Sequence, residues 1–231
     1  MKFYQFFTSF LLILFLVQIS YSQDQIDIFK LYKDNETFAI HCAISETKYM
    51  GKKCVKVVDT GLDTSLKFVK LLPTHFKNGT IEVELSGKPG PNAYAGARGF
   101  VGLAFRIKED NSTFECIYLR PGNSRVMDQA RRNHSVQYIS YPAYPWHKLR
   151  KETPEVYESY VDLIPGEWTR VKIVVKDEKA RLYVHGQSQP TLVINDLKLG
   201  ADQSGAIGLW IGPGTEAHFA NLVVKEDQSG E

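Results

Sequence analysis

The chain has 231 residues, with 28 Lys and Arg against 26 Asp and Glu, which gives a formal net charge of +2 at pH 7. This length suits one β-sandwich domain or two small domains. A charge so close to neutral gives no electrostatic reason to expect a nucleic-acid partner, because proteins that bind nucleic acids present a strongly basic face.

Residues 1–22 predict a secretory signal peptide. Lys2 supplies a positive start, residues 6–17 form an apolar run, and Ser20 and Ser22 are small residues before a cleavage site after Ser22. The run is shorter than the roughly 17–25 apolar residues of a membrane-spanning helix, and no later segment is apolar enough to span a bilayer. We therefore expect an exported protein (periplasmic, cell-surface or extracellular) with a mature chain at residues 23–231.

Alternating apolar residues then predict a series of short strands. In the clearest of them, Ile81, Val83 and Leu85 point one way and Glu82 and Glu84 the other, after a turn at Asn78-Gly79. The predicted strands of this first half are Phe38–Ile44, Cys54–Val58, Phe68–Leu72, Thr80–Ser86, Val101–Ile107 and Phe114–Arg120.

The segment after Arg120 is predicted to be a long irregular loop that returns to a strand at Tyr157–Leu163. A structureless insert longer than about 15 residues in a compact domain is usually functional or disordered. This one is rich in Arg, Tyr and Trp, which is unlike the composition of disordered segments. The loop is therefore predicted to form a binding surface on a rigid β scaffold.

Five further strands complete the chain, at Trp168–Val175, Ala180–Val184, Thr191–Ile194, Ala206–Ile211 and His218–Val224. Many short strands at this spacing, with no long helical pattern, predict an all-β sandwich of two antiparallel sheets. No linker or shift in composition divides residues 23–231, so we expect a single domain. Trp168 is expected in its core.

The three cysteines, Cys42, Cys54 and Cys116, leave the disulfide pattern open. Cys42 and Cys54 lie on neighbouring predicted strands and are able to pair, whereas the alternative is that all three are small buried side chains. Four N-x-S/T sequons, at Asn35, Asn78, Asn111 and Asn133, are glycan acceptors only in a eukaryotic secretory pathway.

Seven segments occur in an order that resembles the concanavalin A-like lectin/glucanase superfamily: NGTIEVEL, GFVGLAFR, FECIYLRP, PGEWTRVKIVV, ARLYVHG, GAIGLWIG and FANLVV. They look most like laminin-G-like jelly rolls related to the 3-keto-disaccharide hydrolase domain family. The resemblance covers about residues 38–224 and implies a concanavalin A-like jelly-roll sandwich. It does not select an activity, because such sandwiches include lectins, protein-binding modules and hydrolases. It implies no cofactor, allows a structural calcium ion whose ligands the spacing does not reveal, and leaves the oligomeric state open.

Glu82 and Glu84 are the candidate catalytic pair. Alternate residues of a strand share a face with Cα atoms about 6–7 Å apart, a separation that suits two carboxyl groups acting on a glycosidic bond. Laminarinase- and lichenase-type members of the superfamily carry E-x-D-x(x)-E, whereas here the central acid is Glu and no third acid follows. The alternative is that both glutamates form the solvated face of a half-buried strand. His134 is a further candidate acid/base group.

We expect carbohydrate binding, to a poly- or oligosaccharide, to be the main activity, on a concave sheet face and the long loop. Planar polar side chains match the hydroxyl groups of sugars, and Tyr and Trp match the apolar faces of sugar rings. The candidate binding residues are Arg106, Tyr118, Arg120, Arg132, Asn133, Tyr138, Tyr141 and Trp146. The alternatives are hydrolysis of a glycosidic bond and a laminin-G-like protein-interaction module, which should expose an apolar patch away from the loop.

Overall fold

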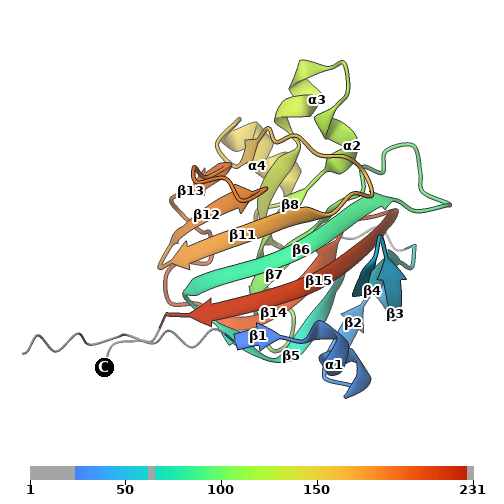
Figure 1. Cartoon of the computed structure of the whole chain (residues 1–231). Coiled ribbons are helices and arrows are strands. Elements are labelled where there is room, and N and C mark those ends of the chain that lie inside the picture. The colour runs from blue at the N-terminus through green and yellow to red at the C-terminus, as the bar shows by residue number, and fades with distance from the viewer. Residues whose placement is uncertain (1–23, 62–65, 228–231) are drawn as a thin grey trace, which may run out of the picture.

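A computed structural model describes residues 24–61 and 66–227, and the predicted signal peptide lies outside these residues. Two antiparallel sheets pack face to face as a sandwich (Figure 1). None of the helices among the described residues is long and apolar enough to cross a membrane. The two packed antiparallel sheets confirm the all-β sandwich that the spacing of the strands predicted.

The sheet nearer the viewer in Figure 1, here called the front sheet, has the strand order β13-β12-β11-β6-β15-β4-β3, and β1 pairs with β15. Its strands are β1 (Asp24–Ile26), β3 (Cys42–Tyr49), β4 (Lys52–Asp59), β6 (Gly79–Pro89), β11 (Thr169–Lys176), β12 (Lys179–Val184), β13 (Leu192–Ile194) and β15 (Thr215–Glu226).

The second sheet, here called the back sheet, has the order β10-β9-β8-β7-β14-β5-β2. Its strands are β2 (Thr37–Ile40), β5 (Phe68–Phe76), β7 (Val101–Ile107), β8 (Phe114–Leu119), β9 (Val136–Tyr141), β10 (Glu158–Ser159) and β14 (Gly205–Ile211). The predicted strand Phe38–Ile44 is in fact two strands, because the chain leaves the back sheet after Ile40 and enters the front sheet at Cys42. His41, between them, has a φ of 50°.

The main core lies between the sheets and is built from the inward-facing residues of each strand. Ile81, Val83 and Leu85 of β6 lie in the same apolar cluster as Leu103 and Phe105 of β7, and all five are buried. Removing this apolar surface from water is the main stabilising contribution to such a fold. The inward and outward alternation predicted for β6 is confirmed, since Glu82 and Glu84 lie on its other face.

The outer face of the back sheet carries a second buried apolar cluster. It includes Phe68, Cys116, Tyr118, Ile139 and Trp210, none of which is more than 3% exposed. Every residue of β7, β8 and β14 is therefore buried. Strands that are covered on both faces have nearly continuous apolar sequences, which explains the runs GFVGLAF and GAIGLWI.

The segment predicted as one long loop contains regular structure. It includes β9 and three short helices, α2 (Pro121–Ser124), α3 (Gln129–Asn133) and α4 (Trp146–Glu152), and the strand predicted at Tyr157–Leu163 is only the two residues of β10. Asp128 caps α3 by accepting a hydrogen bond from the backbone N–H of Arg131. The remaining helix, α1 (Ile28–Lys33), is capped in the same way by Asp27. Figure 1 shows α2, α3 and α4 together at one end of the sandwich.

The three cysteines are free and buried. Burial raises the pKa of the Cys42 thiol to about 11 and also raises the pKa of Cys116. Of the two alternatives that the sequence leaves open, the structure has the one in which the thiols are small buried side chains.

Candidate functional site

The predicted site residues do not form one surface. Glu82 and Glu84 lie on β6, in the front sheet, whereas Tyr118 and Arg120 belong to β8 and its end, in the back sheet. Their side chains point away from the core on opposite faces of the sandwich. Arg106, another predicted binding residue, lies on β7 of the back sheet and is not beside the glutamates, because the neighbours of β6 are β11 and β15.

The side chain of Arg106 is buried and is hydrogen-bonded to neighbouring loops. Its side chain is 0% exposed and donates hydrogen bonds of 2.8–3.2 Å to the backbone carbonyls of Lys77, Gly200 and Asp177 and to Oδ1 of Asn78. Burial lowers the pKa of its guanidinium group, although nearby negative groups oppose this effect. Arg106 ties three loops together and does not reach the surface on which a sugar would bind.

Tyr138 is also inside the sandwich. Its hydroxyl group donates to Oε2 of Glu115 at 2.6 Å and accepts from the backbone N–H of Lys198 at 2.8 Å. Burial, together with the negative charge of Glu115, raises the pKa of Tyr138 well above its usual value. The structure therefore places neither Arg106 nor Tyr138 where a ligand can contact it.

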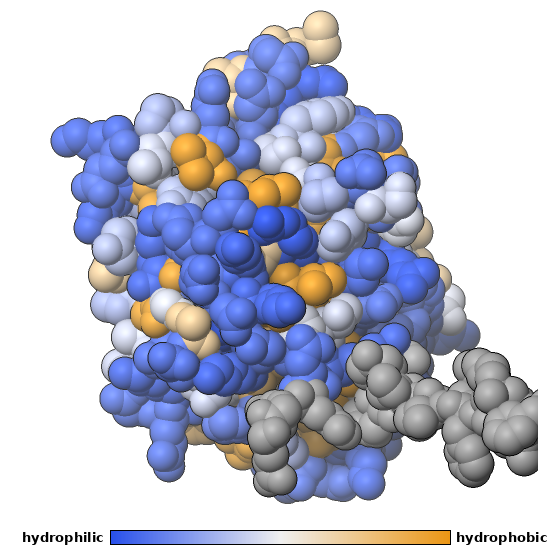
Figure 2. Space-filling view, turned by 90° about the vertical axis from the view of Figure 1, so that its left-hand side faces the viewer, coloured by the Kyte–Doolittle hydropathy of each residue, from blue (hydrophilic) through white to orange (hydrophobic). Residues whose placement is uncertain are grey.

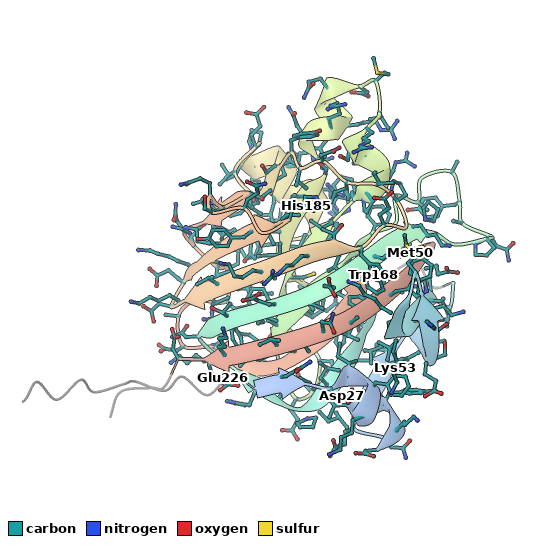
Figure 3. The ribbon with its side chains drawn as sticks, viewed as in Figure 1. Asp27, Met50, Lys53, Trp168, His185 and Glu226 are labelled. Carbon is teal, nitrogen blue, oxygen red and sulfur yellow. The ribbon has the colours of Figure 1, made fainter. Side chains whose placement is uncertain are left out.

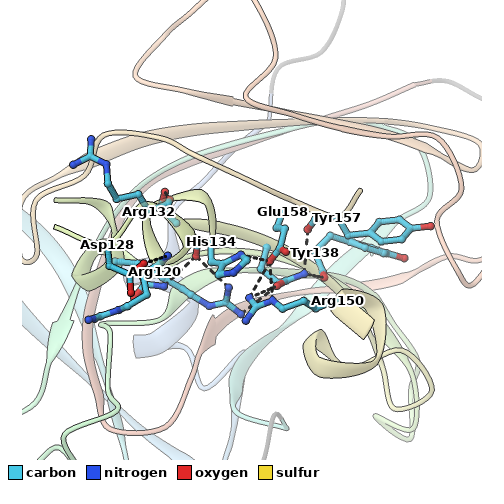
Figure 4. Close-up of polar contacts among 12 residues, drawn as sticks. Arg120, Asp128, Arg132, His134, Tyr138, Arg150, Tyr157 and Glu158 are labelled. Atoms are coloured by element: carbon cyan, nitrogen blue, oxygen red, sulfur yellow. Dashed lines mark hydrogen bonds and ion pairs between the residues drawn. The ribbon is translucent and has the colours of Figure 1, made fainter. Parts of the chain in front are cut away.

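Three residues of the predicted binding surface, Tyr118, Arg120 and Trp146, meet on the outer face of the back sheet, beneath α4. Glu158 of β10 lies directly opposite Gln137 of β9, which lies opposite Tyr118 of β8. Arg120 donates to the hydroxyl group of Tyr118 at 2.7 Å and to Oε1 of Gln137 at 3.2 Å. We call the following residues the arginine cluster: Tyr118, Arg120, His134, Gln137, Trp146, Arg150 and Glu158. Figure 4 labels four of them, Arg120, His134, Arg150 and Glu158.

Arg150 and His134 share one carboxylate. Arg150 donates to Oε2 of Glu158 from Nη2 at 2.9 Å and from Nε at 3.1 Å. Nδ1 of His134 lies 2.7 Å from the same oxygen, but its angles are poor for a hydrogen bond. Burial lowers the pKa of His134, and the charge of Glu158 partly opposes this effect. Figure 4 shows His134, Arg150 and Glu158 converging on this point.

Trp146 is the exposed aromatic residue of the cluster. It is the first residue of α4 and is 42% exposed. The guanidinium carbon of Arg150 lies 4.9 Å from the centroid of its ring, and that of Arg120 lies 5.8 Å away. Arginine groups that pack on the face of an indole restrict its orientation and contribute about 0.5–2 kcal/mol each. The cluster therefore presents a positioned aromatic ring to solvent above planar polar groups.

Of the other predicted binding residues, two lie on α3 just before His134, and the third lies farther along β9, opposite Phe114. Arg132 donates to the hydroxyl group of Tyr160 at 2.9 Å, and Asn133 is exposed at the end of α3. Tyr141 is half-buried, and its ring stacks on Phe114 with centroids 4.9 Å apart. Arg150 and Glu158 are cluster members that the sequence-based prediction missed, because their pairing depends on the position of α4 over β10.

The two predicted catalytic glutamates are both ion-paired on the front sheet. Oε2 of Glu82 lies 2.9 Å from Nη2 of Arg170, and Oε1 of Glu84 lies 2.5 Å from Nζ of Lys52. Burial alone would raise the pKa of Glu84, but hydrogen bonds from Lys52 and Asn221 outweigh it, and the pKa lies below the usual value. Glu84 is therefore an anionic carboxylate at neutral pH, whereas a general acid needs a raised pKa.

A compact aromatic group, which the sequence did not reveal, lies on the front sheet beside these glutamates. Tyr49 stacks on His218 with centroids 3.8 Å apart, and Trp168 contacts Tyr49 edge-on at 5.9 Å. Trp168 is half-buried on the outer face rather than in the core, because it precedes β11 and its ring folds over the sheet. Figure 3 shows Trp168 and Met50 at the same end of this face.

We expect His218 to make the stability of the protein depend on pH. Burial lowers its pKa from 6.5 to about 4, although Glu216 opposes the effect and Lys88 and Lys56 reinforce it. The unfolded chain therefore binds a proton that the folded chain does not bind between these values, so the free energy of unfolding should fall as the pH falls from 6.5 to 4. In His218→Gln this dependence should be weaker by about 1–3 kcal/mol, measured by urea unfolding at several pH values.

The exposed His147 provides the matched control for this measurement. His147→Gln should leave the pH dependence of wild type intact. Parallel curves for wild type and His218→Gln would show that His218 does not bind its proton differently in the two states.

The described residues contain no group of three or more His, Cys, Asp or Glu side chains that could hold a metal ion. No family model matches the chain, and no curated protein matches it. Likeness to known proteins therefore comes from solved structures.

Three solved structures share this architecture. A candidate glycosyl hydrolase from Parabacteroides distasonis has a TM-score of 0.56, with 10% identity over 89% of this chain and 100% of its own. A Bacillus subtilis protein of unknown function with a galectin-like fold has a TM-score of 0.55, with 11% identity over 89% of this chain and 94% of its own. A sialidase has a TM-score of 0.52, with 12% identity over 89% of this chain but 18% of the sialidase. At such identities the likeness shows the fold alone.

The chain has a concanavalin A-like jelly-roll fold. The resemblance predicted from the seven sequence segments is confirmed at this level. The choice between binding and hydrolysis depends on the side chains of this chain.

Proposed function

We propose that this protein is an exported carbohydrate-binding jelly-roll domain that recognises a poly- or oligosaccharide at the arginine cluster. The observation that carries the proposal is the exposed ring of Trp146, positioned by Arg120 and Arg150. An indole ring stacks on the apolar face of a sugar, and the planar side chains beside it match sugar hydroxyl groups. Arg120 is hydrogen-bonded to Tyr118 and Gln137, and Arg150 is hydrogen-bonded to Glu158, so little conformational entropy would be lost on binding.

We also propose that a longer saccharide contacts three predicted binding residues outside the arginine cluster, Arg132, Asn133 and Tyr141. Arg132 lies against the ring of Tyr160, with its guanidinium carbon 4.9 Å from the ring centroid. This pair offers a second planar surface for a neighbouring sugar unit. A site with two such surfaces suits an oligosaccharide better than a single monosaccharide.

Two observations make binding a better proposal than the alternatives. Hydrolysis of the 3-keto-disaccharide hydrolase type would require one of Glu82 and Glu84 to deliver a proton, but both are ion-paired and the pKa of Glu84 is lowered. A laminin-G-like protein-interaction module should show a wide exposed apolar patch. On the side of the molecule that Figure 2 shows, hydrophobic residues form small separate spots among hydrophilic ones.

We expect Trp146→Ala to weaken glycan binding at least about tenfold, since aromatic anchors at the centre of a site contribute most of the affinity. The measurement is retention of the mature chain on a panel of plant, marine and host glycans, followed by titration of the polymers that retain it. Met127→Ala is the matched control, because Met127 is fully exposed on the same segment and has no role in the cluster. Equal affinity of the two variants would contradict the proposed site.

The same incubations test hydrolysis. New reducing ends that appear with wild type and disappear with Glu84→Gln would make the protein a glycosidase. Retention without new reducing ends would support binding.

A further inference from the structure

We propose that the saccharide bound at the arginine cluster carries an anionic group, either a carboxylate or a sulfate ester. This inference rests on the proposed function and concerns the chemical class of its ligand. Its basis is a local excess of positive charge that the protein itself does not neutralise.

The segment that builds the site is far more basic than the chain as a whole. Residues 120–160 contain seven Lys and Arg against four Asp and Glu, a net charge of +3, whereas the whole chain has +2. The rest of the chain is therefore close to neutral. A concentration of one sign of charge around a binding surface selects ligands of the opposite sign and increases their rate of association.

Among the positive charges of this segment, that of Arg120 costs the most free energy, because it is buried. Its side chain is only 5% exposed, so its charge is largely removed from water. The acceptors of its hydrogen bonds are all neutral: the hydroxyl group of Tyr118, the side-chain amide of Gln137 and the backbone carbonyl of His134. A buried guanidinium group normally pairs with a carboxylate, and none lies in ion-pair contact with Arg120 among the described residues.

The one carboxylate in the cluster is already occupied. Glu158 is 5% exposed at its side chain and pairs with Arg150, while His134 lies against the same oxygen. Two guanidinium groups and one carboxylate therefore leave the cluster with a net positive charge even when His134 is neutral. An anion on the ligand would restore the balance.

The two arginines of α3, next to the cluster, also lack a carboxylate partner among the described residues. The Arg132 side chain donates to the neutral hydroxyl group of Tyr160, and Arg131 forms no ion pair with any residue that the structure describes. By contrast, Arg125 at the edge of the segment is neutralised by Asp162 at 2.6 Å. Within residues 120–160, the arginines that form no ion pair with a described residue are therefore Arg120, at the end of β8, and the two arginines of α3.

Arginine fits carboxylate and sulfate groups better than lysine does. Its planar fork donates two parallel hydrogen bonds to two oxygens of one anion. A sugar ring stacked on Trp146 would hold an acidic substituent within reach of Arg120 or Arg150, since both guanidinium groups lie against that ring. A neutral sugar would gain the stacking on the ring and hydrogen bonds to its hydroxyl groups, but no ion pair.

The experiment measures affinity for matched pairs of polymers that differ in charge. Polygalacturonate is compared with its methyl-esterified form, and dextran sulfate with dextran. We expect at least a tenfold preference for the charged member of one pair, and the pair that shows it identifies carboxylate or sulfate as the recognised group. Arg150→Gln and Arg132→Gln should each reduce that preference at least threefold, whereas Lys48→Gln, which removes one exposed charge from β3, should not change it.

The possible outcomes separate this inference from the proposed function. Equal affinity for both members of each pair, lost in Trp146→Ala, would overturn the anionic ligand and leave carbohydrate binding intact. Displacement of the charged polymer by polyglutamate at the same charge concentration would also overturn the inference, because charge alone would then explain the binding. If only neutral glycans of the panel bind, the anionic ligand is again wrong. If no glycan binds at all, the proposed function itself fails.

Discussion

Replacing Arg106 with Met should lower the free energy of unfolding by about 3–5 kcal/mol. The side chain is 0% exposed and donates hydrogen bonds to the backbone carbonyls of Lys77, Gly200 and Asp177 and to the side chain of Asn78. Met fills a similar volume but donates no hydrogen bond. Each buried acceptor that loses its donor costs about 1–3 kcal/mol unless water replaces it. The measurement is equilibrium unfolding in urea or guanidinium chloride.

Arg170→Met is the control for this prediction, because the Arg170 side chain is 64% exposed and pairs with Glu82 at the surface. It should change stability by less than about 1 kcal/mol. Glycan affinity per folded molecule should be unchanged in Arg106→Met, since the structure assigns Arg106 to the interior. A stable Arg106→Met protein that no longer binds glycan would contradict both statements.

Gly102→Ala should lower the free energy of unfolding by about 3 kcal/mol and also weaken glycan binding. Gly102 lies between Tyr118 and Trp210, whose rings meet above it with centroids 4.6 Å apart. A Cβ atom would lie 2.3 Å from the backbone oxygen of Ile117 and 2.5 Å from Cα of Tyr118. Displacing the backbone of a central strand costs free energy because its surroundings are closely packed, and the new atom would force β7 and β8 apart. Tyr118 would then no longer support Arg120 in the position that the cluster requires.

The matched control is Gly90→Ala, in which the nearest atom to the new Cβ lies at 3.6 Å. This contact is ordinary, and the variant should match wild type in both unfolding and binding. Stability and affinity are measured on the same preparations. Wild-type behaviour of Gly102→Ala would mean that the two strands tolerate a wider spacing than the structure indicates.

Alternation along the chain was sufficient to predict the sandwich, because one face of a strand must be buried and the period of two shows which residues occupy it. Glu82 and Glu84 lie on the outer face of β6 for this reason. The same rule places Arg106 on the outer face of β7, with Gly102 and Ala104, and there it is wrong. Its φ of 54° and the shift in register between β7 and β14 mark a bulge, which turns the side chain inward after Phe105. Nothing in the local sequence reveals this bulge.

The site was predictable in composition but not in arrangement. The density of Arg, Tyr and Trp drew attention to the segment that contains Trp146, on which the proposed site is built. Its internal strand was missed, because the polar residues Gln137 and Ser140 fall on opposite faces of β9 and interrupt the alternation of apolar and polar residues. Arg150 and Glu158 acquire their roles only when α4 packs against β9, beside β10, a tertiary contact that alternation cannot predict.

The pairing of β1 with β15 has a practical consequence for how this domain is held. Asp24 lies opposite Val224, so the first and last strands of the described chain run side by side. Figure 1 shows β1 and the C-terminal end of β15 on the side of the sandwich away from α2, α3 and α4. A tether attached at either terminus, whether a sensor surface or a fused partner, would leave the arginine cluster pointing outward. Several copies anchored in this way would present their clusters in one direction, so that a long polymer could engage many of them at once.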